Sequence, residues 1–297
     1  MVILNMRPVY KIFFVFSVLL TISALVVAGV VWSKTGGSFL SADFRGGSVL
    51  ELKFEKGRPS EAITIPDATV LASGDTNIII RSRTITDEKR QEIITTLSAK
   101  HGPVTQQRFD NIGPIVGKEL KTKSIQAVVI LLAAIIIYIS FVFRSMSRVL
   151  SPWALGIAAV FALLHDLIIP IGVFSLLGYY GIAEIGAVFV AAALTILGYS
   201  VSDTVVVFDR VRENVIRYGS KESFPELMHK SIMQTLTRSI NTSMTTLLSL
   251  LAIFFFGGES IKYFALALII GIVAGTYSSI FVASPIVVWW HQRRKKA

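Results

Sequence analysis

The sequence predicts an α-helical polytopic membrane protein, with six transmembrane helices and one small extracytoplasmic α+β domain between helices 1 and 2. Of the 297 residues, 53% are hydrophobic and only 16% are charged. The mean hydropathy is +0.66, which lies outside the range of an ordinary soluble domain. Six apolar stretches are each long enough to cross about 30 Å of hydrocarbon. They cover residues 12–32, 125–143, 152–177, 182–208, 240–256 and 263–290.

The alternation of apolar and charged segments divides the chain into five parts. The parts are 1–38 (N-terminus and first transmembrane helix), 39–123 (extracytoplasmic α+β domain), 124–208 (second to fourth helices), 209–238 (cytoplasmic amphipathic loop) and 239–297 (fifth and sixth helices with a basic C-terminal tail). The domain of about 85 residues can bury one modest core of its own.

The distribution of basic residues predicts the orientation. Short segments on one side of the predicted membrane carry fourteen Lys and Arg residues, and those on the other side carry only Lys34 and Lys262. The positive-inside rule places the fourteen in the cytoplasm, so both termini are expected there. The formal charge of +10 therefore reports topology, and no nucleic acid partner is expected. The chain has no cysteine, so neither disulfides nor thiolate metal sites are available.

The first apolar stretch is interpreted as a membrane helix and not as a cleaved signal peptide. It contains about twenty apolar residues between Lys11 and Lys34, which is longer than a typical signal-peptide core. The sequence that follows Lys34 is also a poor cleavage site.

The domain at 39–123 combines strand and helix patterns. Alternating or β-rich segments predict strands at 49–54, 77–83 and 104–109. Residues 85–100 predict a helix that Thr84 or Thr86 caps, whose core face carries Ile93, Ile94 and Leu97. The domain opens on a motif of two charged residues and two glycines, which by itself indicates a turn. The motif residues are Asp43, Arg45, Gly46 and Gly47.

The predicted loop at 209–238 contains an amphipathic helix. Ser223 and Glu226 form a capping-box pattern, and the apolar stripe that follows consists of Leu227, Met228, Ile232 and Leu236. Such a helix lies at the membrane interface or docks a partner, and the sequence leaves both alternatives open.

The last apolar stretch carries small residues at four-residue spacing. Such a stripe allows a second helix to approach closely, because packing drives helix association in lipid. The contact could lie within the chain, slide during function, or join a second subunit. The stripe consists of Ala267, Gly271, Gly275, Ser279 and Ala283.

Asp203 is the strongest candidate for a functional residue. It lies in a stretch that is uncharged from residue 185 to residue 202, and a charge at the centre of a membrane helix costs about 2.5–3.5 kcal/mol on insertion scales. A carboxylate there needs a partner, a proton or water. Arg238, which opens the fifth helix, could form an ion pair with Asp203 that breaks when the acid is protonated. The alternative is that Asp203 is a structural residue at the membrane interface that pairs with Arg210.

Polar residues around this pair are candidate supporting groups. The fifth helix begins with six hydroxyl or amide side chains between residues 239 and 246, which suggests a hydrated groove inside the bundle. A second intramembrane acid, Asp166, follows His165; because adjacent residues do not share a helix face, we expect an interhelical hydrogen bond or a proton path and no metal site. The supporting candidates are Tyr199, Ser202, Thr204, Asp166, Asn241 and Thr242.

Enzymatic motifs are absent from the sequence. It contains no nucleophile elbow, P-loop, zinc motif or paired-carboxylate spacing, so no enzyme activity and no cofactor are expected.

Four segments, 43–48, 108–117, 198–214 and 235–243, resemble the SecD/SecF family of the resistance-nodulation-division superfamily, and in particular its SecF branch. The resemblance covers nearly the whole chain in order. It implies a subunit of the bacterial protein translocase in the cytoplasmic (inner) membrane, using the proton motive force to promote preprotein export, with protons as the coupling ion. It also implies SecD, the SecYEG channel, YajC and preproteins on the outer side as partners.

The resemblance also implies that Asp203 and Arg238 take part in proton coupling. One departure is Ser202, which stands where the family often has Asn. Two alternatives remain: half of a proton-coupled small-molecule exporter of the same superfamily, for which the small domain leaves little room, and a proton-independent scaffold subunit.

Overall fold

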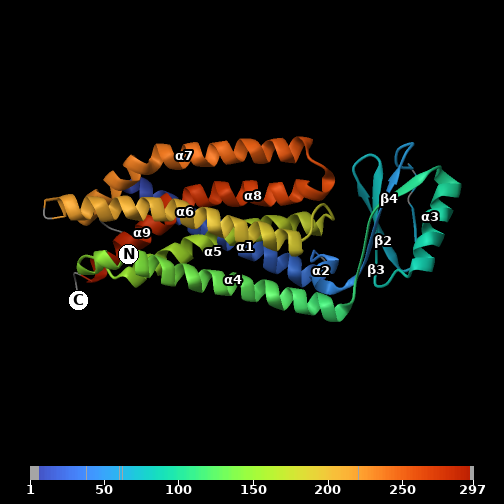
Figure 1. The fold of residues 1–297 in the computed structure, drawn as a ribbon, viewed down its shortest axis with the longest axis horizontal. Helices are drawn as coiled ribbons and strands as arrows, with labels where there is room; N and C mark the ends of the chain where they lie inside the picture. The colour runs from blue at the N-terminus through green and yellow to red at the C-terminus, as the bar shows by residue number, and fades with distance from the viewer. Residues whose placement is uncertain (1–6, 38, 60, 62, 220, 295–297) are drawn as a thin grey trace. The chain divides into compact units, whose positions relative to one another are not determined.

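A computed structural model describes residues 7–37, 39–59, 61, 63–219 and 221–294. The chain divides into two compact units, Met1–Gly37 with Gln126–Ala297, and Ser38–Ile125. We call the first the helical unit and the second the small unit, and Figure 1 shows both in chain colours. Along the chain, the elements of the small unit follow the first long helix.

Six helical stretches of the described chain are long and apolar enough to cross a membrane, so the prediction of a six-helix polytopic membrane protein is confirmed. They are α1 (Pro8–Thr35), α4 (Pro114–Val142), α5 (Pro152–Tyr179), α6 (Ala187–Tyr218), α7 (Phe224–Phe256) and the stretch formed by α8 (Glu259–Ser278), η2 (Ser279–Ala283) and α9 (Ser284–Arg294). A short 3₁₀ helix, η1 (Arg144–Arg148), precedes α5.

The helical unit has a clear centre. In α5 and in the last stretch, 61% of the most apolar 18 residues are buried inside the chain. The share is 11% in α1 and 17% in α4 and α7. α8 packs against α5, α6 and α7, and α1 lies along α5. Gly172 permits the α1 contact, because a Cβ atom there would lie 2.7 Å from the Cβ atom of Ala24.

Most of the segment predicted as a cytoplasmic amphipathic loop, 209–238, is helical in the structure. α6 continues to Tyr218 and α7 starts at Phe224, so most of the segment extends the two membrane helices by several turns. A helix does begin after Ser223 as the capping pattern indicated, but the Ser223 side chain makes no cap hydrogen bond. Its stripe is covered by the chain itself, since Met228 is fully buried.

Asn214 explains part of this extension. Its amide group donates to the Ser231 hydroxyl at 2.8 Å and to the Gln234 side chain at 2.9 Å. These bonds join α6 to α7 over a segment that the sequence suggested was a loop.

The last span departs from a regular helix. Residues Ser279–Ala283 form a π-helix between α8 and α9, and the Ser284 hydroxyl donates to the Ser279 carbonyl at 2.9 Å. The regular four-residue stripe predicted from Ala267 to Ala283 is therefore interrupted at its end. Such π-helical turns occur frequently at functional sites.

The small unit contains a four-stranded antiparallel sheet of order β2-β3-β1-β4, against which the helix α3 packs. The predicted strands and helix are present as β1 (Gly47–Phe54), β3 (Asn77–Ser82), α3 (Asp87–His101) and β4 (Val104–Ile112). The sequence missed the edge strand β2 (Ala68–Ser73) and the short helix α2 (Ala42–Arg45). Thr86, one of the two predicted caps, accepts a hydrogen bond from the Lys89 amide.

The core of the small unit lies between the sheet and α3. Ile93 and Leu97 are buried as predicted, and Ile94 packs against the same cluster. Ser48 is a polar member of this interior: its hydroxyl accepts from the Ile85 amide at 2.8 Å and donates to the Asn111 side chain at 3.0 Å.

The two glycines of the opening motif have a backbone role. Gly46 and Gly47 both have positive φ angles, 74° and 132°. A Cβ atom on Gly46 would lie 2.8 Å from the Pro114 Cα atom, and one on Gly117 would lie 2.9 Å from the Gly46 nitrogen. The start of α4 therefore approaches the motif so closely that a side chain on either Gly46 or Gly117 would clash with the backbone.

Candidate functional site: two carboxylates in the helical unit

Asp203 lies on α6 and is half-buried within this chain. Its carboxylate accepts hydrogen bonds from two hydroxyl groups, one from Ser239 on α7 and one from Ser279 at 2.6 Å. The acid therefore connects α6, α7 and the π-helix. Within the described chain, hydroxyl groups are the only hydrogen-bonding partners of its carboxylate.

The two predicted ion pairs of Asp203 are not formed. Arg238 is exposed on α7, and the neighbouring residue, Ser239, occupies the position beside the acid. Arg210 instead donates to Glu213 at 2.8 Å. Successive residues of a helix point about 100° apart. Because α7 is rotated so that Ser239 faces Asp203, the Arg238 side chain points away from the acid.

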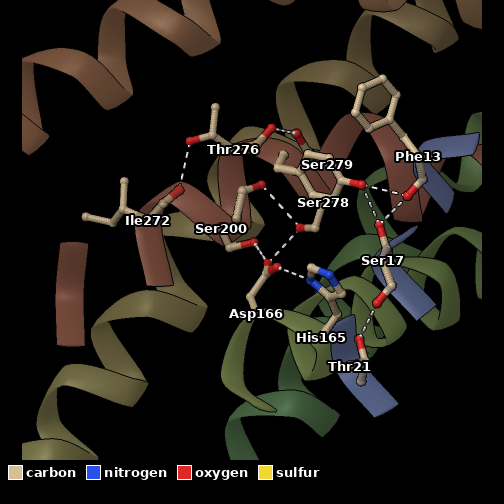
Figure 2. A network of polar contacts seen from close by, with 12 residues as sticks. Phe13, Ser17, Thr21, His165, Asp166, Ser200, Ile272, Thr276, Ser278 and Ser279 are labelled. Carbon is tan, nitrogen blue, oxygen red and sulfur yellow. Dashed lines mark hydrogen bonds and ion pairs between the residues drawn. The ribbon is translucent and has the colours of Figure 1, made fainter. Parts of the chain in front are cut away.

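Asp166 on α5 forms a second and more deeply buried site, which Figure 2 shows. Its side chain is fully buried. One carboxylate oxygen accepts from Ser200 on α6 at 2.5 Å and from Ser278 on α8 at 2.8 Å. The other lies 2.9 Å from Nδ1 of His165. The interhelical hydrogen bonds are as expected, but the two adjacent side chains also contact each other, contrary to the argument from helix faces.

The His165 ring is enclosed on its second side as well. Its Nε2 atom is buried without a hydrogen-bond partner in the described residues. The ring stacks on Tyr277, with centroids 6.2 Å apart and an interplanar angle of 24°. The Tyr277 hydroxyl donates to the Phe13 carbonyl at 2.6 Å and accepts from Ser17 on α1 at 2.9 Å.

None of the six predicted supporting residues is hydrogen-bonded to the Asp203 carboxylate in the described part of the chain. Tyr199 donates to Thr246 at 3.4 Å, whereas Ser202, Asn241 and Thr242 are exposed on the chain surface. Thr204 is fully buried, and its hydroxyl has no partner among the described residues. The predicted support of the acid comes instead from serines.

The polar start of α7 divides into two faces. Ser239 and Ser243 are buried, and Ser243 shares a hydrogen bond of 2.5 Å with Thr276. Asn241, Thr242 and Thr245 are exposed, as is Arg238. Only half of the predicted groove therefore faces inward, and the described residues leave uncovered the outer polar face of α7, which consists of Arg238, Asn241, Thr242 and Thr245.

The small residues of the last span serve packing within the chain. A Cβ atom on Gly271 would overlap the Ile196 side chain, and one on Gly275 would lie 2.9 Å from the Ser200 Cβ atom. Both contacts are to α6. Ser279, the third predicted packing residue, also binds Asp203, so packing and the acid site share one helix face.

Sequence reasoning missed the serine network around Asp166. The available signal was the Ser278-Ser279 pair inside an apolar span together with Ser200, one turn before Asp203. In the described residues no group of three or more His, Cys, Asp and Glu side chains is placed to hold a metal ion.

Comparison with known proteins assigns the family. The C-terminal family of the protein export membrane proteins SecD/SecF matches residues 93–293. The chain belongs to the SecD/SecF family. It is similar to the protein translocase subunit SecF of Thermobaculum terrenum, at 39% identity over 91% of this chain and 90% of that protein.

Members of the SecD/SecF family also include longer chains that this protein matches only in part. It is 37% identical to the protein translocase subunit SecDF of Thermus thermophilus, over 92% of this chain and 37% of that one. The crystal structure of SecDF from that organism, described as a translocon-associated membrane protein, matches with a TM-score of 0.82 and 33% identity, over 99% of this chain and 40% of the other.

Proposed function

We propose that this chain acts as the SecF subunit of the Sec protein translocase and uses the proton motive force, together with SecD, to promote preprotein export across the cytoplasmic membrane. The placement of Asp203 is the observation that supports coupling of export to the proton motive force. Its carboxylate lies in a membrane-spanning helix and is bonded to Ser239 and Ser279 alone among the described residues.

The hydroxyl partners suit a site that changes its protonation state. A hydroxyl can donate or accept, so Ser239 and Ser279 can hold both the carboxylate and the carboxylic acid. An ionised carboxylate without a cation is costly inside a membrane, and a proton removes that cost. Because the two serines belong to α7 and η2, a change of charge on Asp203 alters the preferred arrangement of three helices.

SecD is the partner that the family relationship suggests. The translocase subunit SecDF of Thermus thermophilus is a longer chain, of which this protein matches 37%. We place SecD against the outer polar face of α7, since exposed Asn241 and Thr242 would be unfavourable against lipid. Arg238 on the same face then serves as a counter-ion for Asp203 in a second arrangement of the helices.

The remaining assignments follow from the family and from the charge pattern. The chain is proposed to lie in the bacterial inner membrane with both termini in the cytoplasm and the small unit outside. SecYEG, YajC and preproteins on the outer side are its further partners. No enzymatic step and no cofactor are involved, and protons are the coupling ion.

The test compares Asp203→Asn with Asp209→Asn. Asp209 lies on the same helix, is exposed, and pairs with Arg212 at 2.8 Å, so it controls for the loss of an acid from α6. Preprotein export is measured in membrane vesicles with and without a proton gradient, at equal protein level and with SecD association verified. We expect Asp203→Asn to lose the gradient-dependent part of export and Asp209→Asn to keep it.

Other outcomes favour the alternatives. Full gradient-dependent export by Asp203→Asn would support a proton-independent scaffold. Normal preprotein export by cells lacking the chain, combined with sensitivity to small toxic molecules, would instead support half of an exporter.

A further inference from the structure

The geometry points to a second proton-holding site, the Asp166–His165 pair, which Ser278 and Ser279 couple to Asp203. The inference rests on the proposed proton-driven function and adds to it two residues and a route of communication. Its starting point is a carboxylate with 0% of its surface exposed beside a histidine with 4% exposed.

The charge state of the pair follows from its surroundings. Asp166 receives hydrogen bonds from two serines and from His165, but its described neighbours include no lysine or arginine partner. A buried negative charge without a cation is unfavourable. One proton shared by the carboxylate and the imidazole makes the pair neutral, whichever of the two atoms, Nδ1 of His165 or Oδ1 of Asp166, carries it.

The groups that face the pair come from three helices. α6 contributes the Ser200 hydroxyl, and α8 contributes Ser278 and the titratable ring of Tyr277. α1 contributes Ser17, which reaches the pair only through the Tyr277 hydroxyl. A second acid, Asp203, is bonded to Ser279, the residue that follows Ser278. The buried Nε2 atom of His165 lacks a hydrogen-bond partner among the described residues.

The coupling runs through consecutive residues. Ser278 donates to Asp166 and Ser279 donates to Asp203, and the π-helix starts at Ser279. A gain or loss of the proton on the pair changes what the Ser278 hydroxyl bonds to, and the backbone transmits any displacement to Ser279. Ser278 and Ser279 are therefore positioning residues, and the Asp166–His165 pair sets the arrangement in which Asp203 is held.

The test is the pH profile of gradient-dependent export in vesicles that contain the full chain and SecD. His165→Asn preserves a donor to Asp166 but cannot share the proton, so the alkaline limb of the profile, where export declines as the pH rises, should change position. Ser278→Ala removes a donor that favours the ionised acid, so the limb should move to higher pH.

A matched control distinguishes titration from packing. Ser175 on α5 is fully buried, like Ser278. Among the described residues its hydroxyl bonds only to the Ile171 carbonyl of its own helix, so Ser175→Ala should leave the limb in place. Profiles of His165→Asn and Ser278→Ala that superimpose on the wild type would overturn the inference. If Asp203→Asn has lost gradient-dependent export in the same experiment, the proposed function stands without it.

Infrared spectra provide a readout that does not depend on export. In Asp203→Asn membranes we expect a band from a buried protonated carboxyl or from an imidazolium, which disappears in the Asp166→Asn, Asp203→Asn double variant. Either band reports the shared proton. The absence of both between pH 5 and pH 9 would show that the pair carries none and would contradict the proposal.

Discussion

Ser278 and Ser279 are adjacent in the chain but donate hydrogen bonds to different membrane carboxylates, Ser278 to Asp166 at 2.8 Å and Ser279 to Asp203 at 2.6 Å. The two acids belong to different helices, α5 and α6. A single turn at the start of a π-helix therefore contacts both, and substitutions around this turn should affect them together.

Gly275→Ala should destabilise the contact between α6 and α8. The new Cβ atom would lie 2.9 Å from the Ser200 Cβ atom and 3.5 Å from an Asp166 carboxylate oxygen, and overpacking of this kind costs about 1–3 kcal/mol. We expect a lower thermal aggregation midpoint for the purified protein in detergent. Gly198→Ala is the control on α6, because a Cβ atom there meets nothing within 4 Å. Equal midpoints for the two variants would contradict the close packing.

Gly172→Ala should weaken the attachment of α1 to α5. Its Cβ atom would lie 2.8 Å from the Ala24 Cα atom and 3.0 Å from the Ala24 carbonyl oxygen, both of which are backbone atoms that cannot rotate away. The free energy of unfolding should fall by about 1–3 kcal/mol. Protease sensitivity of α1 in membranes measures the effect, with Gly29→Ala, whose Cβ atom would face open space, as the control. Unchanged sensitivity of the Gly172 variant would count against this contact.

Asn241→Cys should report the partner that covers α7. The chain has no cysteine of its own, so a single introduced thiol can be labelled without background. Asn241 is exposed within this chain, and we expect labelling without SecD and protection with it. Ser243→Cys, on the buried face of the same helix, should be protected in both cases. Equal labelling of Asn241→Cys with and without SecD would place SecD elsewhere.

Ser48→Ala should destabilise the small unit. Ser48 is 1% exposed, and its loss leaves the Ile85 amide without its acceptor, at a cost of about 1–3 kcal/mol. Hydrogen exchange of residues 47–54 in the full-length protein should become faster. Ser82→Ala removes only an exposed bond to the Asp67 carbonyl and should stay within about 0.5 kcal/mol of the wild type. Similar exchange in both variants would show that Ser48 does not stabilise the unit.

Local patterns in the sequence determined most of the secondary structure. The six membrane helices follow from the length of apolar runs, and β1, β3, α3 and β4 follow from alternation and capping. The extent of the helices at 209–218 and 224–238 did not follow from the sequence, because these segments are polar enough to suggest a loop. In the structure Asn214 on α6 binds Ser231 on α7, and Met228 is buried.

The sequence also identified Asp203, because an acid inside an apolar run is a local anomaly that needs no knowledge of neighbours. The sequence did not indicate which groups bind the Asp203 carboxylate. The Arg238 pair was predicted from charge alone, whereas the rotation of α7 places Ser239 at the carboxylate. The partners of Asp166 lie 34 and 112 residues away in Ser200 and Ser278. Such contacts depend on the depth and rotation at which helices pack, and only the tertiary structure sets these.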